Sequence, residues 1–219
     1  MYLSRLILNP RNRRVQRELA QPYEMHRSIM RAFRADLQTG AERVLWRVDE
    51  HPRLGLTLLV QSWDVPDWTW LAEEGARGYL LPVDEPNPAV KSFDLHLAAG
   101  QTLSFRLRAN PTRRLSAGKG NNGKRVGIYK EEDQLAWLTR KGEQHGFRVL
   151  QAQVSRDGKI KDEDAIHRDD QTHKLELLSV QFDGILEVTD PEKLVAAVQA
   201  GIGSAKGFGF GLLSLAPVG

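Results

Sequence analysis

The sequence of 219 residues contains no cysteine. Without a thiol, the chain cannot form disulfides, cysteine-ligated zinc or iron–sulfur sites, or a cysteine nucleophile. It also lacks the apolar run of about 20 residues that a helix needs to cross a bilayer. The apolar residues 1–8 precede a basic cluster, whereas in a signal peptide the charge comes first. These absences predict a globular protein that stays in the cytoplasm and has no membrane partner.

Basic residues are concentrated in two stretches, although the net charge is only +3. Residues 1–35 contain eight Lys and Arg against two Asp and Glu, and residues 101–130 contain eight against none. The stretches 36–100 and 131–219 are acidic, with 5 against 11 and 10 against 15. This distribution predicts a positive face that binds a polyanion, most simply a nucleic acid. The alternative is that both basic stretches are solvated surface.

The apolar pattern predicts the same order of elements twice. In the first half we expect strands over 2–9, 43–49 and 54–63 and helices over 22–38 and 67–76. In the second half we expect strands over 103–108, 147–154, 175–188 and 212–215 and helices over 130–141 and 191–200. Each half approximates βαββαβ, the order of ferredoxin-like (RRM-like) domains. The expected fold is therefore α+β, with tandem ferredoxin-like domains over 1–82 and 101–219 joined by a proline-rich linker and connecting segment, 83–100.

The first candidate site lies on the expected helix 22–38. At about 100° per residue, one apolar stripe is formed by Met25, Ile29, Phe33 and Leu37. The arginines on another side are Arg27, Arg31 and Arg34. Tyr23 and His26 lie at the boundary, where an imidazole beside a phenol and guanidinium groups could transfer protons at a phosphodiester. Alternatively, His26 flanks the core with a satisfied hydrogen bond and Tyr23 packs at the helix start.

The second candidate site is the expected strand 103–108 and the loop after it. Arg106 and Arg108 alternate with Leu107, so both lie on one face of the sheet. The loop interleaves glycines with further basic residues, namely Arg113, Arg114, Lys119, Lys124 and Arg125. Such a loop can follow a phosphate backbone. The absence of acidic residues weakens the alternative of a merely solvated loop.

The third candidate is the glycine-rich segment, residues 201–211, which has five glycines and contains Lys206. Its backbone N–H groups could bind an anion. It is neither a Walker A loop nor a Rossmann turn, because it lacks Gly-Lys-Ser/Thr and follows a helix. Residues 206–210 match the start of an RNP1 motif, but too few residues follow for the rest of that domain. We expect Gly207 and Gly209 to adopt backbone angles that other residues resist and to lie against RNA; tight packing within the fold is the alternative.

A fourth candidate is the polar stretch 162–173, which is rich in carboxylates and contains two histidines. This composition would suit a two-metal nuclease. The interleaved basic residues and the absence of EF-hand or His-Glu-x-x-His spacing favour a solvated hairpin tip instead. No metal site is therefore predicted.

Several motifs along residues 1–217 together carry a family resemblance. They are Met1–Ser4, Pro22–Arg27, Phe105–Pro111, Gly123–Val126, Leu135–Leu138, Phe182–Gly184, Gly201–Gly203 and Gly211–Pro217. In combination they resemble the CasE family, CRISPR RNA-processing endoribonucleases of type I-E systems within the repeat-associated mysterious protein superfamily.

The resemblance implies tandem ferredoxin-like domains that bind the stem-loop of a CRISPR repeat. It also implies cleavage at the 3′ base of the stem without metal or cofactor, after which the protein stays with the other subunits of the Cascade complex. The ribose 2′-OH would attack its phosphorus and give a 2′,3′-cyclic phosphate. The rival function is a non-catalytic subunit that only holds an RNA hairpin.

Roles for individual residues follow from the resemblance and the pattern together. His26 transfers a proton and Tyr23 contacts the 2′-OH or shares the transfer; which of them is base and which acid stays open. Arg27 and Arg31 would lie near the scissile phosphate. The other expected RNA-binding residues are Arg106, Arg108, Arg113, Arg114, Lys124, Arg125, Lys206, Gly207 and Gly209.

Overall fold

The computed structural model describes residues 1–33, 44–115, 125–162, 167–168, 171–172 and 175–218, and it describes no side chains between residues 156 and 176. The chain forms two compact units. The first comprises Met1–Leu95, Asp162–Lys174 and Lys206–Leu212, and the second comprises the remaining residues. The end of the glycine-rich segment thus belongs with the N-terminal residues.

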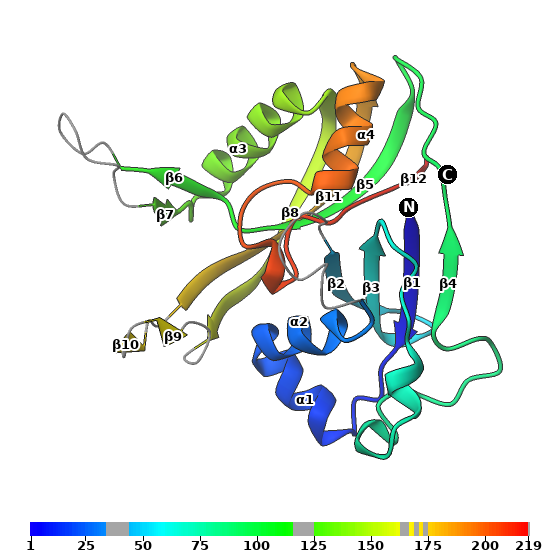
Figure 1. The fold of residues 1–219 in the computed structure, drawn as a ribbon. Helices are drawn as coiled ribbons and strands as arrows, with labels where there is room; N and C mark the ends of the chain where they lie inside the picture. Colours follow the sequence, from blue (N-terminus) through cyan, green and yellow to red (C-terminus); the bar gives the residue numbers. More distant parts are fainter. Residues whose placement is uncertain (34–43, 116–124, 163–166, 169–170, 173–174, 219) are drawn as a thin grey trace. The chain divides into compact units, whose positions relative to one another are not determined.

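The first unit is built on a four-stranded antiparallel sheet in the order β2-β3-β1-β4 (Figure 1). Its strands are β1 (Tyr2–Ile7), β2 (Leu45–His51), β3 (Gly55–Ser62) and β4 (Ala89–Ser92). Tyr2 lies opposite Ser62 of β3 on one side and Ser92 of β4 on the other. This strand order is the one that a ferredoxin-like βαββαβ domain has.

The helices of the first unit differ from the expected ones. Helix α2 spans Pro22–Met30 and is shorter than the expected 22–38. The next amides bond three residues back, Ala32 N to Ile29 O at 3.0 Å and Phe33 N to Met30 O at 3.1 Å, so the chain tightens into turns after Met30. The helix expected over 67–76 is wrong: two short 3₁₀ turns, η2 (Thr69–Ala72) and η3 (Glu74–Ala76), replace it because Glu73 is extended.

A helix that the apolar pattern did not predict, α1 (Arg13–Ala20), precedes α2. Asn12 caps its start, because the side-chain oxygen accepts hydrogen bonds from the backbone N–H groups of Arg14 and Val15. The helix has eight residues and is mostly polar, so it lacks the apolar period by which helices are recognised. The capping residue Asn12 was a signal in the sequence that could have predicted the start of this helix.

One hydrophobic core holds α1, α2 and the sheet of the first unit together. The predicted stripe is buried at its three described positions, with Met25 and Ile29 each 1% exposed and Phe33 7%. Leu37 and Arg34 lie outside the described residues. Burial of this stripe fixes which side of α2 remains for Tyr23 and His26.

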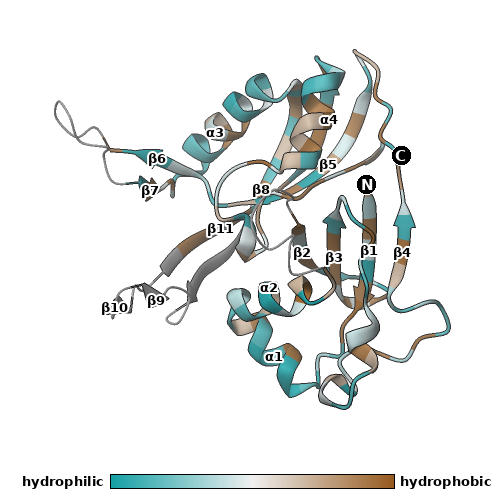
Figure 2. Ribbon diagram, in the orientation of Figure 1, coloured by the Kyte–Doolittle hydropathy of each residue, from teal (hydrophilic) through white to brown (hydrophobic). Residues whose placement is uncertain are grey.

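The second unit repeats the same topology, in the order β12-β5-β11-β8. Its strands are β5 (Thr102–Ala109), β8 (Phe147–Asp162), β11 (Leu175–Val188) and β12 (Leu213–Pro217), and its helices are α3 (Glu131–Gln144) and α4 (Pro191–Ala200). Asp190 caps α4 as its side chain accepts from Lys193 N, and Pro191 is the first helical residue. Trp137 of α3 stacks on Phe182 of β11 at 6.0 Å, and Figure 2 shows hydrophobic and hydrophilic residues on α3, as a half-buried helix requires.

Two hairpins extend from this framework. Strands β6 (Thr112–Arg114) and β7 (Arg125–Gly127) pair antiparallel on either side of the basic loop. Strands β9 (His167–Arg168) and β10 (Gln171–Thr172) pair in the connection between β8 and β11. Within the polar stretch 162–173, the paired residues are 167–168 and 171–172; residues 163–166, 169–170 and 173 lie outside the described residues, so the solvated hairpin tip stays a prediction.

The fold class predicted from the sequence, α+β with two ferredoxin-like sheets, is confirmed. The domain boundaries at 82 and 100 stay a prediction; strand β4 lies inside the segment expected to connect the domains. In the part of the chain that the structure describes, no helix is long and apolar enough to cross a membrane.

Candidate functional site

His26 lies on α2 and is largely buried. Within the described residues, its Nδ1 atom is buried and has no hydrogen-bond partner. The hydrogen bond that a purely structural histidine would be expected to make is therefore missing at this atom. Burial lowers the pKa of His26 below its ordinary value of 6.5, because desolvation disfavours the charged imidazolium. Near pH 7 the imidazole is neutral and can accept a proton.

The end of the glycine-rich segment packs against α2. The 3₁₀ turn η4 (Lys206–Phe208) contacts both α2 and β2. A Cβ placed on Gly207 would be 3.8 Å from the Cδ2 and Nε2 atoms of His26. The Phe208 ring lies 6.3 Å from the Tyr23 ring, tilted by 32°. The structure thus brings Gly207 against His26 and Phe208 near Tyr23, although about 180 positions separate the two segments in the sequence.

Tyr23 is 39% exposed and lies three residues before His26 on the helix. Residues at this spacing are neighbours on the surface of an α-helix. A solvent-accessible phenol next to a neutral imidazole provides two groups that can exchange protons with a ligand. Tyr23 and His26 thus lie on one helix about one turn apart, and their joint role stays a prediction.

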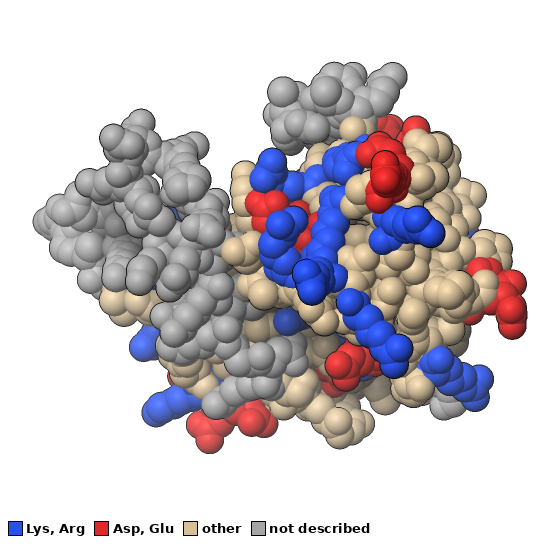
Figure 3. Space-filling model, turned by 90° about the horizontal axis from the view of Figure 1, so that it is seen from below, with Lys and Arg blue, Asp and Glu red and all other residues tan. Residues whose placement is uncertain are grey.

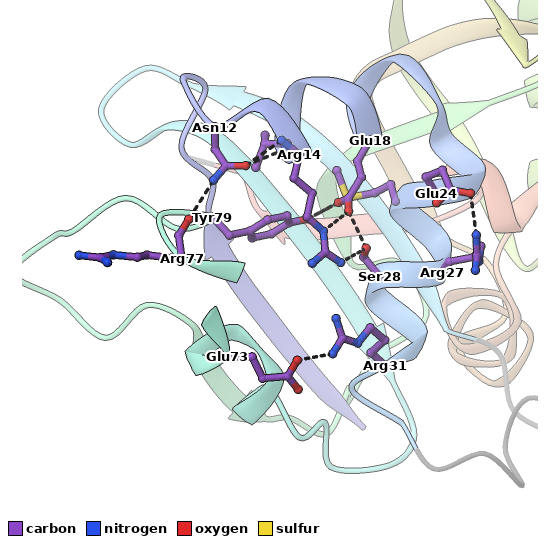
Figure 4. Close-up of polar contacts among 12 residues, drawn as sticks. Asn12, Arg14, Glu18, Glu24, Arg27, Ser28, Arg31, Glu73, Arg77 and Tyr79 are labelled. Atoms are coloured by element: carbon purple, nitrogen blue, oxygen red, sulfur yellow. Dashed lines mark hydrogen bonds and ion pairs between the residues drawn. The ribbon is translucent and has the colours of Figure 1, made fainter. Parts of the chain in front are cut away.

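The two arginines expected beside His26 both have carboxylate partners (Figure 4). Arg27 Nη1 donates to Glu24 at 2.9 Å, and this hydrogen bond is the main cause that raises the pKa of Arg27. Arg31 Nη2 donates to Glu73 at 2.7 Å, and its guanidinium lies 4.7 Å from the centre of the Trp70 ring. Both arginines are exposed, so an anion could reach their guanidinium groups, where the carboxylates already occupy some of the donors.

A buried carboxylate joins α2 to α1 (Figure 4). Glu18 of α1 is 2% exposed and accepts from Arg14 Nε at 2.7 Å, Ser28 Oγ at 2.6 Å and the Tyr79 hydroxyl at 2.6 Å. Ser28 is on α2, two residues from His26. Burial, followed by the negative charge of Glu18, raises the pKa of Tyr79, so the hydroxyl keeps its proton and donates. The network fixes the helix that carries the imidazole.

We expect Glu18→Ala to lower the free energy of unfolding by about 3–5 kcal/mol, because it leaves a partly buried guanidinium and two hydroxyls without their acceptor. Urea unfolding followed by circular dichroism measures this. Gln16→Ala on the exposed side of the same helix is the matched control, with an expected change below about 1 kcal/mol. Equal effects of the two changes would show that the network contributes nothing to stability.

Contacts that the sequence did not reveal hold the glycine-rich segment on β2. Arg47, 2% exposed, donates through Nη1 to the carbonyl oxygen of Leu212 at 3.0 Å. Gly209 has φ +81°, and a Cβ there would be 2.8 Å from Cζ3 of Trp46. The expected unusual backbone angle is thus found at Gly209 but not at Gly207, for which the expectation is wrong. At Gly209, contact with Trp46 supports the packing explanation.

Gly209→Ala should therefore destabilise the fold by about 1–3 kcal/mol, because the methyl group overlaps the Trp46 ring and the backbone angle is strained. Gly207→Ala is the matched control: it needs no unusual φ, and its Cβ would meet His26 at ordinary contact distance. Melting temperatures of both variants, with Gly207→Ala as the control for stability only, and the binding of repeat RNA by Gly209→Ala decide the outcome. Weakened binding by Gly209→Ala with an unchanged melting temperature would instead show that Gly209 faces RNA.

The second candidate site keeps its predicted pattern on β5. Leu103, Phe105, Leu107 and Ala109 are buried, and Arg106 and Arg108 lie on the other face. Arg106 Nε donates to Asp183 at 2.6 Å, and Arg108 Nε donates to Ser179 Oγ at 2.8 Å. The two guanidinium groups are therefore held along one open sheet face, which confirms their predicted orientation.

The β6–β7 hairpin presents further basic side chains. Arg113, Arg114 and Arg125 are exposed, and Arg114 lies directly opposite Arg125 in the strand register. Like charges at directly opposed positions are destabilising in a two-stranded ribbon, so a bound anion would stabilise this hairpin. Lys124, Lys119 and the loop glycines lie outside the described residues.

Three exposed arginines in or just before α1 were not identified as candidate site residues from the sequence. Glu18 and Glu24, the two carboxylates of residues 1–35, are both engaged by arginines of the same two helices. Arg11, Arg13 and Arg17 are exposed and have no ion-pair partner among the described residues. Figure 3, which views the protein from below Figure 1, shows several exposed Lys and Arg side chains together with Asp and Glu side chains. The charge excess of the segment therefore lies at its surface.

Among the described residues, no group of three or more His, Asp or Glu is placed to hold a metal ion. The side chains of the polar stretch 162–173 lie outside the description.

The family model described as "CRISPR associated protein" matches residues 1–217. The chain is 39% identical over 226 residues to the CRISPR-associated endoribonuclease Cse3 of Thermus thermophilus, covering 99% of this chain and 100% of that protein. It is 32% identical over 234 residues to the CRISPR system Cascade subunit CasE of Escherichia coli, and both chains are fully covered. A solved structure of Thermus thermophilus Cse3 bound to an RNA representing a pre-cleavage complex matches with a TM-score of 0.80 at 38% identity, covering 99% of this chain and 98% of that one. The chain therefore belongs to the CRISPR-associated protein family and, within it, to the CasE group.

Proposed function

We propose that this protein is a CRISPR RNA-processing endoribonuclease of the cytoplasm. It binds the stem-loop of the CRISPR repeat, cleaves the precursor at the 3′ base of the stem without a metal or other cofactor, and stays on the product with the other Cascade subunits. The names of its relatives support the activity and the assembly. The observation that carries the proposal is the imidazole of His26, whose buried Nδ1 has no hydrogen-bond partner among the described residues, with Gly207 against the ring and exposed Tyr23 three residues before it on α2.

RNA brings its own nucleophile, the ribose 2′-OH, so the protein needs only to position it, move protons and stabilise charge. Attack on the adjacent phosphorus forms a bond between the 2′ oxygen and phosphorus. It breaks the bond between phosphorus and the 5′ oxygen of the next nucleotide. The products are a 2′,3′-cyclic phosphate and a 5′-OH. A proton must leave the 2′-OH and another must reach the departing oxygen, and His26 with Tyr23 provides groups for both transfers.

The lowered pKa of His26 favours the neutral form, which can take the proton of the 2′-OH. Tyr23 would then contact the same hydroxyl or serve the leaving oxygen. Arg27 and Arg31 stabilise the phosphate as they exchange Glu24 and Glu73 for RNA oxygens, and Lys206 adds positive charge from η4. Gly207 has no side chain, so the turn packs against one part of the imidazole without a Cβ between them.

The RNA stem is held through its phosphates. Double-stranded RNA is recognised mainly by its shape and backbone, which suits guanidinium groups on a sheet face and a hairpin. The residues proposed for this are Arg106, Arg108, Arg113, Arg114, Lys124, Arg125 and three exposed arginines in or just before α1, namely Arg11, Arg13 and Arg17. Gly209 packs on Trp46 and supports the glycine-rich segment from within the first unit.

Arg108→Ala and Arg113→Ala should each weaken binding and make the dependence of log K on log salt shallower by about one unit per lost phosphate contact. Binding isotherms at several salt concentrations, with RNA that cannot be cleaved, measure both slopes. Lys91→Ala, an exposed cation on strand β4, is the matched control. Unchanged slopes in both arginine variants would show that the second basic stretch does not contact RNA.

The rival function is a non-catalytic subunit that only holds the hairpin. It is compatible with the name of one relative, which describes a Cascade subunit and not an enzyme. Purified protein incubated with labelled repeat RNA separates the two. Two fragments cut at the 3′ base of the stem support the endoribonuclease, whereas intact bound RNA after many half-lives of the expected reaction supports the rival.

A further inference from the structure

A buried arginine connects strand β2 to Leu212, the residue that directly follows the glycine-rich segment. Nε of Arg47 donates to both carboxylate oxygens of Asp49, at 2.8 and 3.0 Å, and Nη1 donates to the Leu212 carbonyl at 3.0 Å. A charge that is 2% exposed costs free energy unless it is paired, so an aliphatic residue would be the simpler choice for this strand position. What the guanidinium adds is a donor that reaches a distant backbone carbonyl.

Neighbouring contacts extend this attachment toward His26. Gly209 packs on Trp46, the residue before Arg47, and Phe210 and Leu212 are 0% and 2% exposed. The segment from 209 to 212 is therefore fixed on β2. The turn that immediately precedes it places Gly207 against the imidazole of His26.

We propose that Arg47 is a positioning residue for RNA cleavage: by holding the carbonyl of Leu212, it keeps the turn Lys206–Phe208 over the imidazole of His26. The inference rests on the proposed function. Arg47 itself is buried and acts through the backbone of the segment, so it is not a catalytic residue.

The position of the turn also bears on the protonation of His26. Burial is what lowers the pKa of this imidazole, and the turn is one of the elements that cover it. The other charged or titratable groups on the two elements are Tyr23, Glu24 and Arg27 on α2 and Lys206 on the turn. A looser turn would admit water, which stabilises the imidazolium and moves the pKa of His26 up toward 6.5.

Arg47→Lys is the informative variant. Lysine keeps a cation beside Asp49, but its single ammonium cannot reproduce the fork that serves Asp49 and Leu212 together. Arg47→Met also removes the charge and leaves Asp49 without its partner, so loss of folding in that variant would not bear on the proposal. Arg5→Lys is the matched control, because Arg5 lies on strand β1 of the same sheet, pairs with Glu85 and does not hold the segment.

Three quantities are measured on folded Arg47→Lys: the single-turnover cleavage rate, the affinity for uncleavable repeat RNA, and the NMR titration of His26. We expect the rate to fall by about tenfold or more, the affinity to change by less than about threefold, and the His26 pKa to rise. A wild-type rate with an unchanged titration would overturn the proposal. If wild-type protein fails to cleave repeat RNA, the proposed function fails, whereas the His26 titration still reports whether Arg47 holds the turn.

Discussion

Replacing His26 with alanine is expected to lower the single-turnover cleavage rate by about 10² to 10⁴, the usual contribution of one acid–base residue. The affinity for repeat RNA should stay close to that of the wild type, because the proposed phosphate contacts are made by the arginines and not by His26. Quenched time courses with excess protein measure the rate without interference from product release. His96→Ala removes an exposed histidine outside the proposed site and is the matched control. A His26→Ala rate within threefold of the control would remove His26 from the mechanism.

The pH dependence of the same reaction provides a second readout. The pKa of His26 is lowered in the folded protein, so if the neutral imidazole is the base, the rate should fall only below pH 6.5. The same shift affects folding: the unfolded chain binds this proton at its ordinary pKa, so stability decreases as the pH falls from 6.5 through the folded value. A rate that rises on acidification through this range would instead assign the acid role to His26.

A single 2′-deoxy substitution at the scissile nucleotide is expected to abolish cleavage. The substitution removes the nucleophile, while every phosphate that the arginines contact remains. Binding of the deoxy-substituted repeat should therefore be unchanged within about twofold, and no product should form over many wild-type half-lives. The same substitution one nucleotide upstream is the control and should be cleaved normally. Cleavage of the substituted site would mean that water, and not the 2′-OH, attacks the phosphorus.

The topology was predictable because strand alternation and helix period are strong in most elements. In β5, Leu103, Phe105 and Leu107 alternate with exposed residues, and α4 has its cap at Asp190 and Pro191 at its first position. The sequence did not predict features that depend on tertiary packing. The end of α2 depends on the turns after Met30, and the strand β4 lies among proline-rich residues where its pairing with β1 is not visible locally.

The candidate residues on α2 were proposed from the sequence, whereas their contacts with the glycine-rich segment were not. Tyr23 and His26 were recognised from their spacing on one helix. That Gly207 lies on the imidazole depends on contacts between residues 47 and 212, which no local pattern encodes. The partners of Arg27 and Arg31 were likewise hidden, because Glu73 reaches Arg31 only through the folding of the η2–η3 region.

The central claim is that RNA and the protein side chains suffice for the reaction. Its most direct test is incubation of the wild-type protein with end-labelled CRISPR repeat RNA in excess EDTA, followed by identification of the product ends. We expect the full rate of cleavage at the 3′ base of the stem, with a 2′,3′-cyclic phosphate on one fragment and a 5′-OH on the other. Cleavage reduced to background by EDTA, or fragments that carry a 5′-phosphate, would contradict it.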